Sequence, residues 1–382
     1  MAKHLAKLNI ESFRGIKNFR LEDTSDINII VGDNNSGKTS VLEALMLLRN
    51  PGSFPSVLNV VRLRAARSLI SMGQIPTFDA FINLFNKDIN NPNMKLEVGG
   101  EVNNTILNTG IKGELEDVMI DAEEMAKFDS RIRQKMKYGE IIYNPEIPTF
   151  IGEQYCTVGK IESVESISYN YYSSQQMRIL TREFAVTNFL YVSPIEHYGG
   201  EVFDRVIRNE NYKNIVIKVL QTFDKDITDL LILRNEHTSM PVEFIKHNKS
   251  GIMPLSTYGD GLKKVILLAD RIASAQDGVL LIDEIETAIH IRSYQDIFNF
   301  VVKACMEFNV QLFATTHNIE ALDSILKTQY NDKTSEYDKK QKDLIRVITF
   351  RKDEKTGETL SRVMPGSKVF HNRESFDFEV RI

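Results

Sequence analysis

The chain alternates short aliphatic runs with longer segments in which apolar residues recur every three or four positions. The aliphatic runs cover residues 27–31, 279–282, 310–315 and 344–350. A continuous apolar run of this length is typical of a strand that is buried on both faces of a parallel sheet. Helical length and periodicity mark the segments 40–48, 262–273 and 291–308. An α/β fold with a mixed sheet is therefore predicted.

The middle of the chain has a different pattern. Residues 94–98, 105–115 and 160–172 alternate between apolar and polar positions, which is typical of antiparallel strands with one exposed face. Residues 114–137 are predicted to be a helix-rich insertion of mixed charge, and 202–223 a second helical block. We therefore predict an antiparallel β lobe with a helical insertion. The predicted domains are the N-terminal part of the core (1–92), the β lobe with its insertion (93–190), and a helical region with the C-terminal part of the core (191–382).

Residues 32–39 read Gly-Asp-Asn-Asn-Ser-Gly-Lys-Thr and lie between the first aliphatic run and the helix at 40–48. A phosphate-binding P-loop has this spacing and this strand–loop–helix setting, because its backbone N–H groups must wrap a triphosphate while the helix aims its positive end at the same charge. Lys38 can reach the outer phosphates, and the Thr39 hydroxyl is placed to bind Mg²⁺. The alternative is a Gly-Asn turn with an incidental lysine. The predicted ATP-binding residues are Gly32, Asn34, Asn35, Ser36, Gly37, Lys38, Thr39 and Ser40.

Two carboxylates close the aliphatic run at 279–282. Asp283 and Glu284 would lie at the carboxyl end of a strand, where open α/β sheets bind their ligands. After a P-loop, this pair predicts that Asp283 holds Mg²⁺ together with Thr39, and that Glu284 orients the attacking water of ATP hydrolysis. His317 closes the next aliphatic run, and βαβ logic makes the two strands neighbours and places its imidazole near the γ-phosphate. Outside this context, a lone histidine is usually structural.

A third group of residues precedes the helix at 262–273. Positions 255–261 read Leu-Ser-Thr-Tyr-Gly-Asp-Gly. Serine, aspartate and glycine before an apolar helix can be a simple N-cap. Because this segment stands between the P-loop and the acidic pair, it also looks like an ABC signature, whose helix N-terminus and serine bind the γ-phosphate of a nucleotide held by a second subunit. The candidate residues are Ser256, Gly259, Asp260 and Gly261.

In this order, the motifs resemble ABC-type ATPases of the RecF/SMC/OLD branch. The opening segment 8–17 is similar to the first strand of that branch, whose arginine, here Arg14, lies near the nucleotide. The runs 283–290 and 378–382 resemble the stand-alone OLD-like ATPases, a group that includes the ATPase subunits of PARIS-type anti-phage systems. The resemblance implies ATP and Mg²⁺ as cofactors, and an ATP-sandwiched homodimer or larger oligomer.

Two positions depart from the family pattern. The family serine usually stands one residue before the glycine, whereas Ser256 stands three residues before Gly259, so the register of the serine stays open. His290 stands where many relatives carry an aspartate. It is either a residue of the nucleotide site or a polar residue at the start of a helix.

Composition and charge limit the partners. A formal charge of −5 argues against a globally basic surface for nucleic acid. Basic clusters at Arg62, Arg64 and Arg67 and at 131–137 leave local contact with nucleic acid open, although a solvated helix face or a protein interface is favoured. No apolar run approaches the length of a membrane span and the N-terminus has no signal-peptide pattern, so a cytoplasmic protein without membrane contact is expected. Two cysteines are too few for a disulfide framework.

The same resemblance bears on nuclease activity. OLD nucleases carry a Toprim domain after the ATPase, but residues 318–382 contain no paired Asp-x-Asp. The prediction is therefore an ATPase that controls a separate effector protein, such as a Toprim-type nuclease, in anti-phage defence. Two alternatives stay open, a RecF-like DNA-repair ATPase that binds DNA directly and a nucleotide-locked scaffold with negligible hydrolysis.

Overall fold

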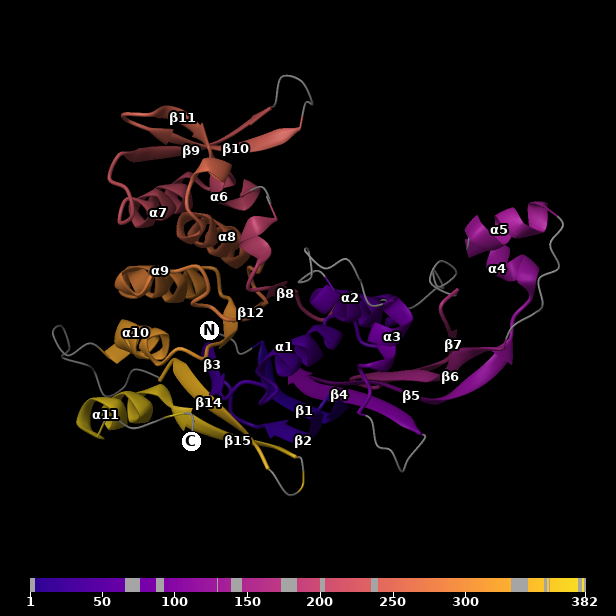
Figure 1. Ribbon diagram of the computed structural model, residues 1–382. Helices are drawn as coiled ribbons and strands as arrows, with labels where there is room; N and C mark the ends of the chain where they lie inside the picture. Colours follow the sequence, from indigo (N-terminus) through magenta and orange to yellow (C-terminus); the bar gives the residue numbers. More distant parts are fainter. Residues whose placement is uncertain are drawn as a thin grey trace. The chain divides into compact units, whose positions relative to one another are not determined.

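The computed structural model describes residues 4–65, 76–86, 93–128, 130–138, 146–172, 184–199, 203–234, 240–330, 343–353, 356, 358–376 and 380. The chain divides into two compact units (Figure 1). The first comprises Met1–Lys7, Leu21–Leu42 and Thr187–Ile382, and the second comprises Leu8–Arg20 and Glu43–Val186. The three domains expected from the sequence have other boundaries and remain a prediction.

A mixed six-stranded sheet forms the centre of the first unit, in the order β15-β14-β3-β13-β12-β8. The strands are β3 (Ile27–Gly32), β8 (Phe189–Val192), β12 (Val279–Ile282), β13 (Gln311–Thr315), β14 (Ile345–Lys352) and β15 (Thr359–Pro365). β3 pairs in parallel with β13 and β14, and β12 pairs in parallel with β13 and β8, whereas β15 is antiparallel to β14. The four aliphatic strands and the β12–β13 neighbourhood are thus confirmed. Every residue of β3, β12 and β13 is buried, which explains their continuous apolar sequences.

Helices and a small antiparallel sheet complete the first unit. The helices are α6 (Asp204–Arg208), α7 (Glu210–Leu220), α8 (Asp260–Ser274), α9 (Tyr294–Glu307), α10 (Ile319–Tyr330) and α11 (Gly366–Phe376). The small sheet contains β9 (Ile227–Arg234), β10 (Pro241–His247) and β11 (Gly251–Pro254). In Figure 1 the helices from α7 to α11 follow one another in tiers away from the small sheet. Their apolar faces share one core with the central strands, in which Ile29, Leu280 and Val265 are fully buried.

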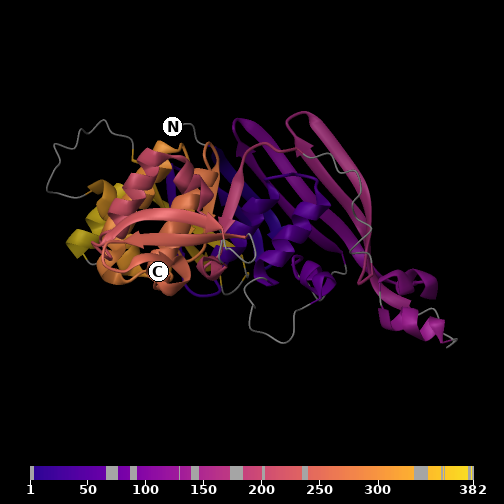
Figure 2. The ribbon, with the colours of Figure 1, turned by 90° about the horizontal axis from the view of Figure 1, so that it is seen from above.

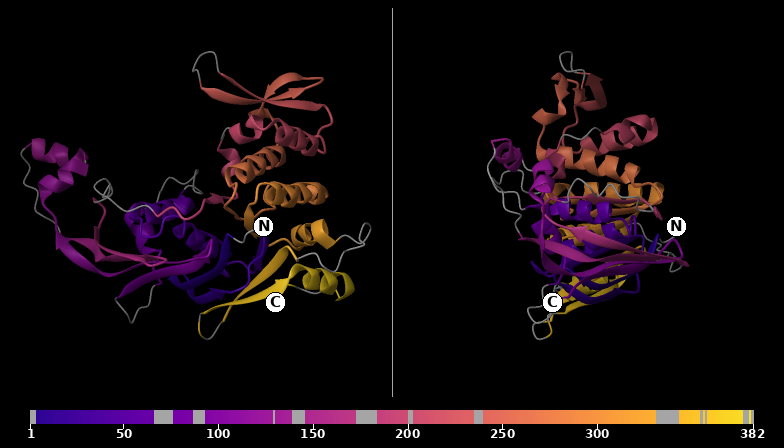
Figure 3. Two further views of the ribbon diagram at one scale, coloured as in Figure 1. Left: turned by 180° about the vertical axis from the view of Figure 1, so that it is seen from behind. Right: turned by 90° about the vertical axis from the view of Figure 1, so that its right-hand side faces the viewer.

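The second unit contains a six-stranded sheet in the order β2-β1-β4-β5-β6-β7, visible from above in Figure 2. The strands are β1 (Leu5–Phe13), β2 (Ile16–Leu21), β4 (Met94–Val102), β5 (Thr105–Met119), β6 (Glu146–Val158) and β7 (Ile161–Tyr169). The pairs from β4 to β7 are antiparallel, as predicted for the β lobe. Helices α2 (Phe54–Ala65) and α3 (Thr77–Ile82) precede the lobe in sequence, and α4 (Ala122–Phe128) and α5 (Ser130–Lys137) form the insertion between β5 and β6. Figure 3 shows this insertion at the far end of the two strands.

The predicted start of the insertion was wrong. Residues 114–119 belong to β5, where Glu114 pairs with Ile151 and Met119 with Glu146 of β6. The helical block at 202–223 is confirmed as α6 and α7 within the described residues 203–223. Arg67 and most of the segments 332–343 and 378–382 lie outside the described residues. Cys156 and Cys305 are both buried free thiols. Among the described helices, none has the length and apolarity to cross a membrane.

Candidate nucleotide-binding site

The loop between β3 and helix α1 (Lys38–Leu47) has the backbone of a P-loop. Gly32 has φ of 153° and Gly37 has φ of 101°. A Cβ atom on Gly32 would lie 2.6 Å from the carbonyl oxygen of Phe350 on β14, so only glycine fits beside that strand. Asn35 also has a positive φ, 64°, which asparagine tolerates better than most residues. The local sequence is therefore required by the shape of the loop.

Two side chains of the loop are polar groups that a phosphate could engage. The Lys38 ammonium donates to the carbonyl oxygens of Gly32 at 2.7 Å and Asp33 at 2.8 Å, so it lies folded over the loop. Burial lowers the pKa of Lys38, against the opposing charge of nearby acids, chiefly Asp283. The Ser36 hydroxyl is buried and has no hydrogen-bond partner among the described residues. Both groups would gain from an anionic ligand in the loop.

Asp283 is the centre of a hydrogen-bond network that joins three elements. It follows β12 and is 1% exposed. The Thr39 hydroxyl at the start of α1 is 3.1 and 3.0 Å from its two carboxylate oxygens. Thr315, at the end of β13, donates to Oδ1 at 2.6 Å, and the Tyr191 hydroxyl of β8 donates to Oδ2 at 3.3 Å. The hydroxyl and carboxylate oxygens of Thr39 and Asp283 are ligands that Mg²⁺ prefers, so the donor set fits this ion.

Glu284 is held in a backbone conformation that is rare for glutamate. Its φ is 48°, and its N–H donates to the hydroxyl oxygen of Thr315 at 2.8 Å. Its carboxylate accepts a hydrogen bond from the Thr287 hydroxyl at 3.2 Å. Left-handed backbone at a non-glycine residue costs about 1 kcal/mol or more, and such strain clusters at functional sites. Thr315 thus positions both acids with one hydroxyl, a role that the sequence alone did not show.

His317 lies two residues beyond β13. Its side chain is 55% exposed, and Nδ1 is 3.1 Å from Oε1 of the buried Glu286. The same carboxylate oxygen accepts the backbone N–H of His317 at 3.1 Å. The structure therefore joins His317 to the turn that carries Asp283 and Glu284. Its placement beside a γ-phosphate remains a prediction.

The candidate signature residues surround the start of α8. Ser256 lies in the 3₁₀ helix η3 (Leu255–Thr257), Gly259 is the N-cap residue of α8, and Asp260 begins the helix. The Asp260 carboxylate pairs with Lys263 at 3.3 Å. A Cβ atom on Gly259 would meet nothing within 4 Å, whereas one on Gly261 would lie 3.0 Å from the carbonyl oxygen of Ala288. Glycine is thus sterically favoured at Gly261 within this chain, and Gly259 presents open space.

Arg14 and His290 both have structural partners. Arg14, in the second unit, has φ of 52°, and its Nε is 2.9 Å from Oε2 of the fully buried Glu43. Arg64 pairs with the same carboxylate at 2.8 Å, which supports a structural role over phosphate binding for this basic residue. His290 caps the 3₁₀ helix η4 (Ile291–Ser293) by accepting the N–H of Arg292 at 3.2 Å. This hydrogen bond supports the interpretation of His290 as a polar residue at the start of a helix.

One buried residue near the site was missed by the sequence analysis. Lys264 of α8 is fully buried, and its ammonium has no hydrogen-bond partner among the described residues. Burial lowers the pKa of Lys264 to about 8, opposed by the charges of Glu196, Glu286 and Asp283 in that order. Lys263 and Lys264 are adjacent in the sequence, and the sequence did not indicate that one of them is buried. From the pattern of helix α8 alone, either lysine would be expected in solvent.

Two family models match the chain. The "AAA ATPase domain" model matches residues 4–181, and the model described as "AAA domain, putative AbiEii toxin, Type IV TA system" matches residues 168–323. An ATP/GTP phosphatase of Helicobacter pylori is 24% identical over 341 residues, 85% of this chain and 88% of that protein. The DNA replication and repair protein RecF of Shewanella sp. strain MR-4 is 51% identical over 55 residues, which span 14% of this chain and 15% of that protein.

Solved structures of SMC heads are also similar in shape. An SMC head bound to the C-terminal winged-helix domain of ScpA aligns with a TM-score of 0.49 and 11% identity, over 96% of this chain and all of that one. The SMC head domain of Thermotoga maritima aligns with a TM-score of 0.43 and 14% identity, over 95% and 99% of the two chains. The P-loop, the acidic pair at the end of β12 and the matches to the two AAA models together support a P-loop ATPase.

Proposed function

We propose that this protein binds and hydrolyses Mg-ATP between two copies of the chain and uses its nucleotide state to control a separate effector protein. The observation that carries the proposal is the network around Asp283. A P-loop threonine, the Asp283 carboxylate and the strained Glu284 meet at the carboxyl ends of the parallel strands in the central sheet. A turn with only a structural role would not require two acids beside a phosphate-binding loop.

The roles follow from the chemistry of each side chain. Lys38 exchanges its two carbonyl partners for the outer phosphates, which bind an ammonium more strongly because they are charged. Thr39 and Asp283 would hold Mg²⁺, and the ion would supply positive charge for the transferred phosphoryl group. Glu284 accepts a proton from water as the general base, and Thr315 fixes its backbone. His317, paired with Glu286, donates to the γ-phosphate from its exposed edge.

The two-chain arrangement rests on the start of α8. The space beside Gly259 is open, and Gly259 directly precedes the N-terminus of α8, the positive end of the helix dipole. A triphosphate bound by Lys38 of one copy and by the α8 N-terminus of another gains donors that neither copy supplies alone. Association should therefore depend on ATP.

Control of a separate effector is supported by the acidic groups of the chain. Within the described residues, the one group of three or more histidine, cysteine or acidic side chains that lie close enough to share a metal ion is Asp224, Asp226 and His247. His247 Nδ1 accepts the backbone N–H groups of Lys249 at 3.2 Å and Ser250 at 3.0 Å, so Nε2 carries the proton and donates to Asp224. A protonated nitrogen cannot bind a metal, and this cluster locks a turn instead. The family description that names a type IV toxin–antitoxin system favours defence as the setting.

The test separates binding from hydrolysis. Glu284→Gln keeps the shape of the side chain but removes the base, so it should bind Mg-ATP and lose turnover by a factor on the order of 10² or more. Glu320→Gln, an exposed acid in the first turn of α10, is the control and should turn over like the wild type. Turnover by Glu284→Gln at the wild-type rate would remove Glu284 from the mechanism. Metal-dependent nuclease activity of the purified chain that survives Asp283→Ala would contradict a separate effector.

A second candidate, direct DNA binding of the RecF kind, is favoured by one observation. Arg131, Arg133, Lys135 and Lys137 are all exposed on α5, a helix with no buried residue. Such a cluster of exposed charges can contact a phosphate backbone. Duplex DNA that stimulates ATP turnover in the wild type, but not when these four residues are changed to Gln, would favour this function over effector control.

A further inference from the structure

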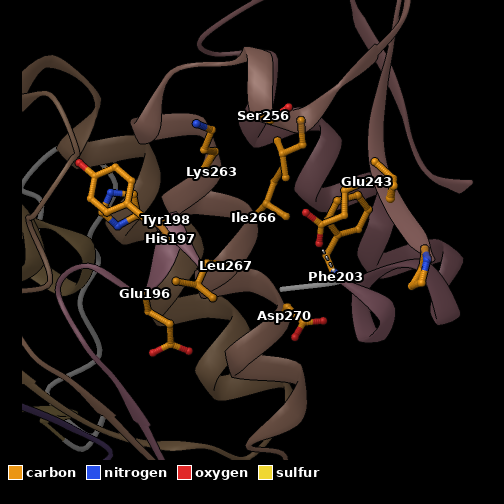
Figure 4. Close-up of a pocket in the computed structure, with 13 residues that line it drawn as sticks. Glu196, His197, Tyr198, Phe203, Glu243, Ser256, Lys263, Ile266, Leu267 and Asp270 are labelled. Atoms are coloured by element: carbon orange, nitrogen blue, oxygen red, sulfur yellow. Dashed lines mark hydrogen bonds between the residues drawn. The ribbon is translucent and has the colours of Figure 1, made fainter. Parts of the chain in front are cut away.

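A pocket of about 280 Å³ lies in the first unit, between helix α8 and strand β10. Its walls also include the 3₁₀ helices η2 (Glu196–Tyr198) and η3, and Ser256 of η3 lies at one side. Figure 4 shows His197 and Tyr198 on one side, Glu243 and Phe203 on the other, and Ile266 and Leu267 of α8 between them. The volume is just below the range of roughly 300–1,000 Å³ that is usual for small-molecule sites, so only a small group fits.

Two acidic side chains face this pocket. Glu243 accepts the backbone N–H of Phe203 at 3.0 Å, and Asp270, which is 5% exposed, accepts that of Arg205 at 3.0 Å. Burial raises the pKa of both carboxyl groups, and the charge of Asp270 helps to raise that of Glu243 to about 7. No ion pair joins Glu243 to a cation within the part of the chain that the structure describes. A bound cation would relieve the repulsion between the two acids.

The cations near the pocket are already engaged. Lys263 pairs with Asp260 at 3.3 Å, and the Nε of Arg271 donates to Glu196 at 2.8 Å. Arg271 also pairs with Asp270, with Nη1 3.5 Å from Oδ2. Glu243 is therefore the acid of the pocket that has no cation beside it among these neighbours.

A second and independent feature is His197. It is 7% exposed, packs against Tyr198 with ring centroids 4.1 Å apart and ring planes tilted by 39°, and lines the pocket. Neither ring nitrogen has a partner at hydrogen-bonding geometry among the described residues, although the Pro194 carbonyl lies nearby. Burial, followed by the charge of Lys264, lowers the pKa of His197, so the ring is neutral and offers one donor and one acceptor. Such a buried orphan group is expected to meet a polar group that the chain itself does not supply.

We propose that this pocket binds an organic cation, a primary amine or guanidinium on a short apolar chain. The cationic head lies between Glu243 and Asp270, and the apolar chain packs against Phe203, Ile266 and Leu267. A second polar group of the ligand reaches His197. An anion would be repelled by the two carboxylates, and a neutral ligand would leave Glu243 without a counter-charge. The same chemistry belongs to a free amine and to the arginine or lysine side chain of a partner protein.

The experiment is isothermal titration of the full chain. Agmatine is the probe for a free cation, and Nα-acetyl-arginine amide is the probe for a protein side chain. 1,4-Butanediol and butyrate test the requirement for positive charge. The variants are Glu243→Gln, which removes one acid without changing its shape, and His197→Phe. Glu210→Gln, an exposed acid in the first turn of α7, is the matched control. ATP binding reports that each variant is folded.

We expect the guanidinium probes to bind and the diol and butyrate not to bind. Glu243→Gln should weaken binding by about ten- to a hundredfold, the effect of a lost charge-assisted contact, while Glu210→Gln should leave it unchanged. His197→Phe should weaken it less. Tighter binding of agmatine identifies a free cation, and tighter binding of the capped arginine identifies a protein side chain. The proposal is overturned if neither guanidinium binds the wild type, or if both bind Glu243→Gln and wild type equally.

Discussion

Thr315→Val tests whether one hydroxyl positions both acids of the nucleotide site. Valine has nearly the same shape as threonine, and Thr315 is fully buried, so the change removes hydrogen bonds and little else. The lost contacts are the donation to Asp283 at 2.6 Å and the acceptance of the Glu284 N–H at 2.8 Å. A hydrogen bond to a charged group contributes about 1.5–3 kcal/mol, and a buried N–H left without a partner costs about 1–3 kcal/mol.

The free energy of unfolding should therefore fall by about 3 kcal/mol, and the melting temperature by about 6–12 °C for a unit of this size. Turnover should fall by about 10- to 100-fold, because a displacement of the acids near 1 Å has an effect of that order. Calorimetry and phosphate release, the latter measured well below both melting temperatures, provide the two readouts.

Two companion variants separate positioning from stability. Thr315→Ser keeps the hydroxyl and should retain most of the turnover. Thr349→Val removes another buried threonine hydroxyl. Thr349 lies on β14, away from the two acids, and its hydroxyl donates to the Val380 carbonyl at 3.1 Å. It should cost about 1 kcal/mol of stability and leave turnover near the wild-type rate. If Thr315→Val turns over as fast as Thr349→Val, Thr315 has a structural role only and the reasoning fails.

Three other variants test the remaining features. Lys38→Ala should lose ATP binding in a folded protein, as measured by fluorescent nucleotide titration, and unchanged affinity would remove the P-loop assignment. Gly259→Arg should keep nucleotide binding by the monomer but abolish ATP-dependent association in light scattering; Gly261→Arg is a poorer probe because its Cβ meets Ala288 in the same chain. Glu243→Gln should be more stable than the wild type at pH 8 by about 1–2 kcal/mol, a value reduced for partial exposure, and the gain should vanish below about pH 4. The sign follows from the raised pKa of Glu243 in the folded state, because the wild type then loses stability relative to the variant as pH rises toward 7. Equal melting curves of the wild type and the variant at both pH values would contradict this prediction.

The sequence was most informative where local pattern and tertiary environment agree. Three elements are rich in apolar residues because they contribute to a common core: the strand before the P-loop, the run that ends at Asp283, and helix α8. The β12–β13 pairing followed from a helix-sized connection between two such strands. These elements needed no long-range information to be recognised.

The sequence was least informative where partners are distant. Residues 114–119 read Glu-Leu-Glu-Asp-Val-Met and include good helix formers, yet they continue β5 because β6 supplies a full set of backbone partners. Thr315 gave no local indication that it would bind Asp283 from another strand. The pocket around Glu243 also depends on three elements brought together by the fold, so no sequence window contains it.

The central position of β3 has a consequence for synthesis of the protein. Asn28 on this strand donates to the carbonyl oxygen of Leu312 on β13, 284 positions later, and β14 is made later still. At roughly 5–20 residues per second, the ribosome would need about 15–60 s to supply these partners. During that time both hydrogen-bonding edges of a strand that is fully buried in the finished protein are unsatisfied, which favours aggregation or chaperone binding. Slower translation of the last third of the chain should therefore lower the soluble yield without changing the stability of the finished protein.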